Sequence, residues 1–131
     1  MKKPDGIIKI KRVYDVPLIS DGYRVLVDKL WPRGVRKENL PYNEWAKGIT
    51  PSAKLRAWFH AAPLERWQEF SRLYTAELAG SPEMEMFLSR IQPYKTVTLL
   101  YASKDPVHNH AQILKAFIEK QYANYHTQPG K

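Results

Sequence analysis

A short apolar run that leads directly into a cationic loop narrows the possible folds of this chain more than any other stretch. Residues 25–27 read Val-Leu-Val, an apolar and mostly β-branched run that is typical of a buried strand. The strand should end in an irregular loop, because Pro32 cannot donate to a sheet ladder and Gly34 permits a tight turn. That loop carries Arg33. Open α/β sheets bind ligands at the carboxyl ends of their strands, so we expect an anion site here.

The remaining pattern predicts a layered α/β domain rather than a helical bundle, because strands stand at both ends of a helical middle. Alternating apolar and basic residues in the first strand predict an edge or half-exposed position. The sequence leaves open whether the helical segment 51–92 caps the sheet or covers one of its faces. The expected strands cover residues 7–13, 23–30, 42–45 and 96–101, and the expected helices cover 51–61 (with Thr50 as N-cap), 63–79, 82–92 and about 106–123.

Length and composition predict one globular domain over residues 1–131, with flexible tails at about 1–5 and 124–131. Hydrophobic residues make up 44% and charged residues 26% of the chain, which is ordinary for a folded protein. The chain contains no cysteine, which excludes disulfides, thiolate zinc sites and a cysteine nucleophile. No apolar stretch has the length of a signal peptide or a membrane span, so we expect a cytoplasmic protein without a membrane partner.

The positive charge of the chain is concentrated in its first half. The formal net charge is +8, and the segment up to Arg56 contains 13 basic and 6 acidic residues, against 8 and 7 beyond it. A basic field raises the local concentration of phosphates and nucleic acids. The distribution therefore favours an anionic partner near the Arg33 loop.

Residues 101–110 form a second candidate wall for the anion site. They begin at the end of the 96–101 strand and lead into a helix, whose first N–H groups and dipole attract anions. If the two central strands are parallel neighbours, Lys104 and Arg33 project over the same end of the sheet. Asp105 and His110 are candidate proton carriers.

Several of these side chains also have purely structural interpretations. Asp105 before a proline is a typical N-cap, and Asn109 could cap the same helix. His110 falls on the apolar face of that helix, where a buried and hydrogen-bonded histidine is common. Asp28 could form a structural ion pair with Lys29 or Arg24. A metal site is not expected, because no histidine pair has the i,i+4 spacing.

Three sequence blocks resemble the YeaO-like family, within the domain-of-unknown-function family numbered 488. They are residues 24–37 (RVLVDKLWPRGVRK), 51–60 (PSAKLRAWFH) and 97–105 (VTLLYASKD), and the similarity extends over about residues 8–118. The resemblance implies a single Rossmann-like α/β domain with a small, mostly parallel sheet flanked by helices. It also implies action on phosphorylated sugars, nucleotides or nucleic-acid ends, but identifies no cofactor.

The leading hypothesis is an enzyme that acts on a phosphate-bearing ligand in a cationic pocket without a cysteine. The alternatives are a non-catalytic nucleic-acid-binding module that uses the basic first half of the chain, or a protein-interaction domain that has lost its chemistry. The predicted catalytic residues are Asp105 and His110, and the predicted substrate-binding residues are Arg33, Lys104, Arg24, Asp28, Tyr101, Asn109, Ser52 and Arg56.

Overall fold

The computed structural model describes residues 6–127, which form a small parallel sheet and a layer of helices. Short 3-10 helices in the connections precede β2, follow the Arg33 loop and precede α1. The strands and α-helices in chain order are β1 (Ile7–Arg12), β2 (Tyr23–Leu26), β3 (Glu44–Trp45), α1 (Ala53–Ala61), α2 (Pro63–Ala79), α3 (Pro82–Ile91), β4 (Thr96–Tyr101) and α4 (His110–Thr127).

The sheet has the strand order β1-β4-β2-β3, and each neighbouring pair is parallel. The predicted α/β class is confirmed, and the sheet is fully parallel among the described strands. The first strand lies at an edge, as its basic residues indicated. Val25 of β2 is in register with Leu99 of β4. The carboxyl ends of β2 and β4 therefore lie side by side, which is the arrangement that a shared site requires.

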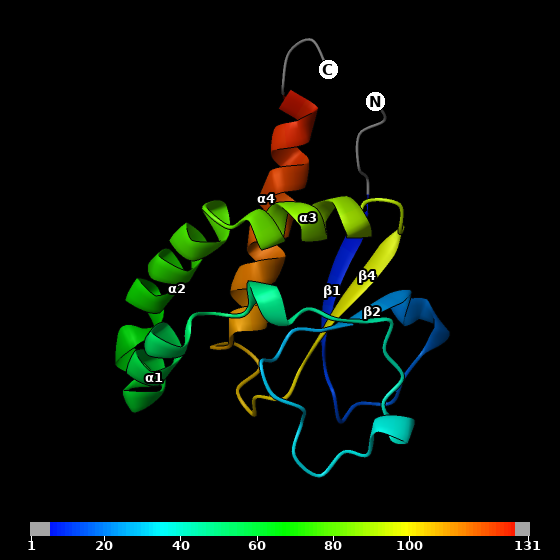
Figure 1. Cartoon of the computed structure of the whole chain (residues 1–131), viewed down its shortest axis with the longest axis horizontal. Coiled ribbons are helices and arrows are strands. Elements are labelled where there is room, and N and C mark those ends of the chain that lie inside the picture. Colours follow the sequence, from blue (N-terminus) through cyan, green and yellow to red (C-terminus); the bar gives the residue numbers. More distant parts are fainter. Residues whose placement is uncertain (1–5, 128–131) are drawn as a thin grey trace.

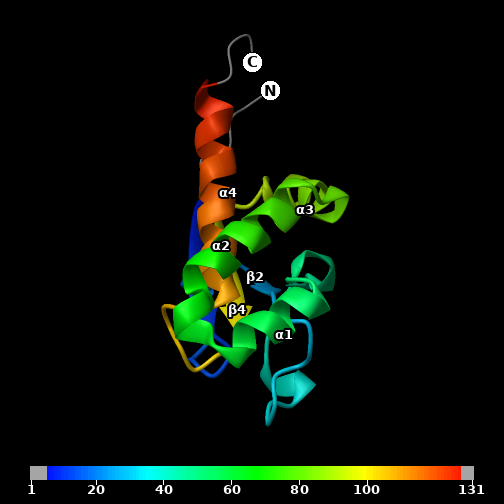
Figure 2. The same ribbon diagram turned by 90° about the vertical axis from the view of Figure 1, so that its left-hand side faces the viewer.

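The helices cover one face of the sheet, as Figures 1 and 2 show. Val25 and Leu99 point to this face and join a large core with side chains from all four α-helices. Each fully buried side chain of this kind stabilises the fold by about 1.5–3 kcal/mol. The segment 51–92, which the sequence left unplaced, thus packs together with α4 on one face of the sheet.

The opposite face of the sheet is covered by loop segments instead of helices. Leu26 and Leu100, which alternate with the residues of the large core, form a smaller cluster there with Leu40. Beside it lies a buried polar group around Asp21, which is fully buried and forms ion pairs with Lys11 and Arg24. The loop that carries Arg33 therefore has its own small core and is held against the sheet.

β2 is shorter than the predicted strand 23–30. Val27 still donates to the Leu100 carbonyl (3.0 Å), but its successor leaves the ladder. The Asp28 carboxylate accepts the Ala102 N–H, and the Asp28 carbonyl accepts the indole N–H of Trp45. These side-chain bonds replace regular pairing and end the strand.

Two helix starts were also predicted wrongly. α1 begins at Ala53, because Ser52 rather than Thr50 is the N-cap: the Ser52 hydroxyl accepts the Leu55 N–H. The Thr50 hydroxyl instead donates to the Lys47 carbonyl.

α4 begins at His110 rather than near residue 106, since Asn109 caps it by accepting the Gln112 N–H. At its far end α4 continues to Thr127, so residues 124–127 of the expected tail are helical. The other expected tail residues, 1–5 and 128–131, lie outside the described part of the chain.

Candidate functional site: a cationic cavity at the strand ends

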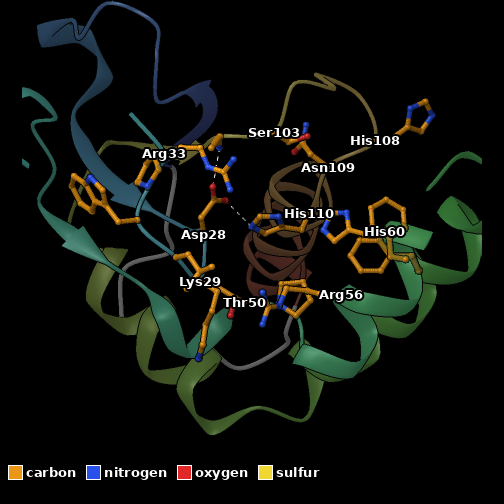
Figure 3. A pocket seen from close by; sticks show the side chains of 17 residues that line it. Asp28, Lys29, Arg33, Thr50, Arg56, His60, Ser103, His108, Asn109 and His110 are labelled. Carbon is orange, nitrogen blue, oxygen red and sulfur yellow. Dashed lines mark hydrogen bonds and ion pairs between the residues drawn. The ribbon is translucent and has the colours of Figure 1, made fainter. Parts of the chain in front are cut away.

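A cavity of about 390 Å³ lies at the carboxyl ends of β2 and β4, where the parallel sheet predicts a ligand. Its volume is in the range of small-molecule sites. It is enclosed by the loop after β2, the region of α1, Phe70 of α2, and the loop that joins β4 to α4 together with the first residue of α4. The cavity is lined by residues with polar side chains that are all labelled in Figure 3: Asp28, Lys29, Arg33, Thr50, Arg56, His60, Ser103, His108, Asn109 and His110.

Asp28 is the one carboxylate among the lining residues, and it connects the two central strands. Its Oδ2 atom accepts the backbone N–H of Ala102 (2.9 Å), which follows β4. Its Oδ1 atom lies 3.4 Å from Nε2 of His110. Burial raises the pKa of Asp28, while the charge of His110 and the Ala102 N–H act in the opposite direction. The carboxylate is thus held in a fixed position at the inner end of the cavity.

His110 begins α4 and faces Asp28 from the helical side (Figure 3). Its Nε2 atom lies 2.7 Å from the Val27 carbonyl, which can only accept, so Nε2 carries a hydrogen. Burial lowers the pKa of His110 despite the stabilising charge of Asp28, and His60 and Arg56 lower it further. These effects favour a neutral imidazole that donates from Nε2.

Three cations line the cavity: Lys29, Arg33 and Arg56. None of them forms an ion pair within residues 6–127, where the ion-paired cations are others. Arg56 is half-buried, and its Nε atom is buried without a hydrogen-bond partner among the described residues. A buried donor without a partner costs about 1–3 kcal/mol. The cavity therefore has an excess of positive charge and an unused donor.

Five of the ten predicted site residues line this cavity, and five do not. Figure 3 shows Asp28 and His110 pointing toward each other, with Arg33 and Arg56 on opposite sides of the pair. Those that line it are Arg33, Asp28, Asn109, His110 and Arg56; those that do not are Lys104, Asp105, Arg24, Tyr101 and Ser52.

Arg24 lies on the opposite face of the sheet from the helices and the cavity. It is 6% exposed, forms an ion pair with Asp21, and donates from Nε to the Pro41 carbonyl (2.6 Å). Burial acts to raise the pKa of Asp21, but hydrogen bonds from Lys11, the Leu18 N–H and Arg24 outweigh it, so this pKa is lowered. Lys11, Asp21 and Arg24 thus form a buried ion cluster with a structural role.

Asp105 and its neighbours organise the loop before α4. Asp105 Oδ1 accepts the N–H groups of Val107 and His108 (both 2.9 Å), and Oδ2 lies 3.0 Å from Nδ1 of His108. The two backbone donors lower the pKa of Asp105. Asn109 donates its amide to the Asp105 carbonyl and caps α4. Asn109 lines the cavity, but its side chain is committed to this loop and helix cap.

The other three predicted residues that do not line the cavity lie on the surface, in the core or at a helix cap. Lys104 is exposed on the loop after β4. Tyr101 is 4% exposed and belongs to the large core. The Ser52 hydroxyl donates to Glu77 of α2 (2.7 Å) and caps α1.

The cavity also includes residues that were not predicted as site residues. His60 follows Arg56 by four residues on α1, so both project from the same side of that helix. This spacing was available in the sequence and would have identified His60. No comparable spacing in the sequence indicates that Thr50 and Ser103 line the cavity. His108 lies at the outer end of the cavity, with its ring edge-on to Trp67 (5.2 Å).

No group of three or more histidine, aspartate or glutamate side chains within residues 6–127 could hold a metal ion. No helix in this part of the chain has the length and apolarity needed to cross a membrane.

The fold and the cavity define an α/β domain with a parallel sheet, one helical layer and a cationic cavity at the carboxyl ends of its central strands. A sequence model of one family, described as the inactive DUF488-N3 subclade, matches residues 7–130. The chain belongs to this family, in agreement with the resemblance noted in the sequence.

The relatives of the chain are uncharacterised proteins of similar length. The uncharacterised protein YeaO of Escherichia coli (strain K12) is 46% identical over 111 residues, covering 85% of this chain and 96% of that protein. An uncharacterised protein of Mycobacterium tuberculosis (strain H37Rv) is 36% identical over 111 residues, covering 85% and 92% respectively. No solved structure matches the chain.

Proposed function

We propose that this protein binds a phosphate-bearing small molecule, such as a phosphorylated sugar, a nucleotide or a nucleic-acid end, in the cationic cavity. The observation that carries the proposal is Arg56, whose buried Nε has no hydrogen-bond partner among residues 6–127, in a cavity shared with Lys29 and Arg33, which form no ion pair within the same residues. Arginine suits bidentate binding of a phosphate, while lysine acts as a point charge. A phosphate would supply the missing acceptor and balance the charge.

The position of α4 supports an anion in the same place. This helix of 18 residues begins at His110 in the wall of the cavity. The N-terminus of a helix has free N–H groups and the positive end of the helix dipole, which together favour an anion by about 0.3–1 kcal/mol when exposed.

The arrangement favours binding over catalysis. The chain has no cysteine to act as a nucleophile. Of the two predicted proton carriers, Asp105 does not line the cavity, and His110 directs its Nε2 hydrogen to the Val27 carbonyl. The matching family is itself described as inactive. We therefore propose a binding protein that senses or sequesters its ligand.

Thermal unfolding with and without ligand tests this proposal, because a ligand that binds only the folded state raises the melting temperature. Suitable ligands are glucose 6-phosphate, adenosine monophosphate and a 5′-phosphorylated dinucleotide. We expect at least one to stabilise the wild type, and Arg56→Gln to abolish that shift.

The matched control is Arg72→Gln, which removes the same charge from an exposed residue of α2 that pairs with Glu69. It should retain the shift. Equal stabilisation of the wild type and the Arg56→Gln protein would contradict the proposal.

A further inference from the structure

Asp28 places a negative charge inside a cavity whose other fixed charges are positive. Its side chain is 18% exposed, and the Ala102 N–H occupies its Oδ2 atom. A phosphate alone would be repelled by this carboxylate. The cations are therefore only one part of the surface that recognises the ligand. The question is what the second carboxylate oxygen, Oδ1, can bind.

The nearest donor to Asp28 Oδ1 is already engaged. His110 Nε2 lies 3.4 Å from Oδ1 but only 2.7 Å from the Val27 carbonyl. Since a neutral imidazole carries one hydrogen, and the Val27 carbonyl can only accept, the Nε2 hydrogen is directed to Val27. Asp28 Oδ1 is left without a well-placed donor among the described residues.

The lining cations do not neutralise Asp28 either. Within residues 6–127, Asp28 forms no ion pair with Lys29, Arg33 or Arg56. Figure 3 shows Arg33 and Arg56 on opposite sides of the Asp28–His110 pair, while the Lys29 side chain extends away from the carboxylate. A ligand that fills the cavity must offer negative charge to the cations and a hydrogen-bond donor to Asp28.

We infer that the ligand is a phosphate ester that carries a hydroxyl group near the phosphate, and that this hydroxyl donates to Asp28 Oδ1. The ligand class is that of phosphorylated polyols and sugars. The inference rests on the proposed phosphate-binding function and adds the second recognition element. A cavity of about 390 Å³ has room for both groups.

Two phosphate esters with the same three-carbon chain distinguish the contribution of the hydroxyl from that of the phosphate. Glycerol 3-phosphate has hydroxyl groups, and n-propyl phosphate has none. Calorimetric titration of the wild type should give an affinity about tenfold or more higher for glycerol 3-phosphate, as expected for a hydrogen bond to a charged acceptor. 2,3-Dimethoxypropyl phosphate keeps the oxygen acceptors but has no hydroxyl donor. Its affinity should therefore lack the increase expected for glycerol 3-phosphate. This comparison requires no variant protein.

The Asp28→Asn variant tests whether the preference for glycerol 3-phosphate depends on the Asp28 carboxylate. The amide oxygen can still accept the Ala102 N–H, but the negative charge is gone. We expect the affinity for glycerol 3-phosphate to fall and that for n-propyl phosphate to stay or rise, so the preference shrinks to about twofold, the size of a weak neutral hydrogen bond. Asp15→Asn, which removes one negative charge from an exposed residue outside the cavity, should keep the full preference.

The outcomes separate this inference from the proposed function. Equal binding of glycerol 3-phosphate and n-propyl phosphate by the wild type would overturn the role of the hydroxyl while leaving phosphate binding intact. A preference that persists in Asp28→Asn would overturn the role of Asp28. If neither ester binds, the proposed phosphate site fails, and this inference fails with it.

Discussion

Asp21 and Asp28 lie at opposite ends of β2 and have different partners. Asp21 is fully buried and accepts hydrogen bonds from Lys11, Arg24 and the Leu18 N–H. Asp28 has one oxygen held by the backbone and one that faces the cavity. A fully paired carboxylate contributes to the fold, whereas an incompletely paired one in a cavity is available to a ligand.

Asp21→Asn should destabilise the protein by about 3–5 kcal/mol, because it leaves the buried Arg24 without its counter-charge. Urea unfolding measures this loss. Glu69→Gln is the control, since the Glu69–Arg72 pair is exposed and its loss should cost far less than the loss of a buried pair. Similar losses in the two variants would contradict a structural role for the buried ion cluster.

The contribution of Asp21 should also depend on pH in one direction. Its pKa is lowered in the folded state, so its stabilising effect is complete above the unfolded-state pKa of about 3.9 and is lost as the pH falls through the folded-state pKa. The stability difference between wild type and Asp21→Asn should therefore narrow below about pH 4. A difference that stays constant down to the acid transition would argue against this linkage.

At the scale of elements, two glycines with positive φ frame β2 and the loop after it. Gly22 (φ 66°) precedes the strand, and Gly34 (φ 78°) turns the cationic loop. A Cβ atom on Gly22 would lie 2.3 Å from the Thr96 carbonyl oxygen, whereas one on Gly34 would meet nothing within 4 Å. The two glycines thus share a positive φ but have different steric surroundings.

Gly34→Ala should cost about 1–2 kcal/mol, the strain of a left-handed residue with a side chain. Gly22→Ala should cost more, about 2–5 kcal/mol, because a steric clash with β4 adds to the same strain. Chemical unfolding of both variants tests the ranking. A Gly34→Ala protein less stable than Gly22→Ala would contradict the described packing.

The elements themselves were largely predictable, and the errors have local causes. β4 was predicted with the bounds that it has, because its six residues are continuously apolar or β-branched. The starts of α1 and α4 were wrong because two polar residues within a few positions of each other could each serve as the N-cap. Tertiary contacts decide such cases: Ser52 is oriented by Glu77, and Asp105 is engaged by its own loop.

The site could be predicted only in part. The pairing of β2 with β4 explains why Arg33, Asp28 and His110 come together, since all three follow from parallel strand ends. The position of Arg56 depended on which face of α1 packs inward, and the sequence pattern gave that face. Arg24 was misplaced relative to the cavity because strand alternation puts it on the opposite face, where Asp21, three residues earlier in the chain, pairs with it.

At the scale of the whole molecule, the basic first half of the chain does not form one uniform surface. Lys11 and Arg24 are bound to Asp21, and Arg36 pairs with Glu38, whereas Lys29, Arg33 and Arg56 converge on the cavity. We propose that these three cavity cations form a phosphate-binding site and do not contribute to an extended nucleic-acid-binding surface.

Amide NMR spectra recorded during titration with glycerol 3-phosphate test this claim most directly. We expect saturable shifts confined to the residues around the cavity, 28–33, 50–60, 70 and 102–110, and their loss in Arg56→Gln. No saturable shift, or shifts spread over the exposed lysines and arginines that disappear as salt is raised, would contradict it, because the second pattern is that of a nonspecific polyanion surface.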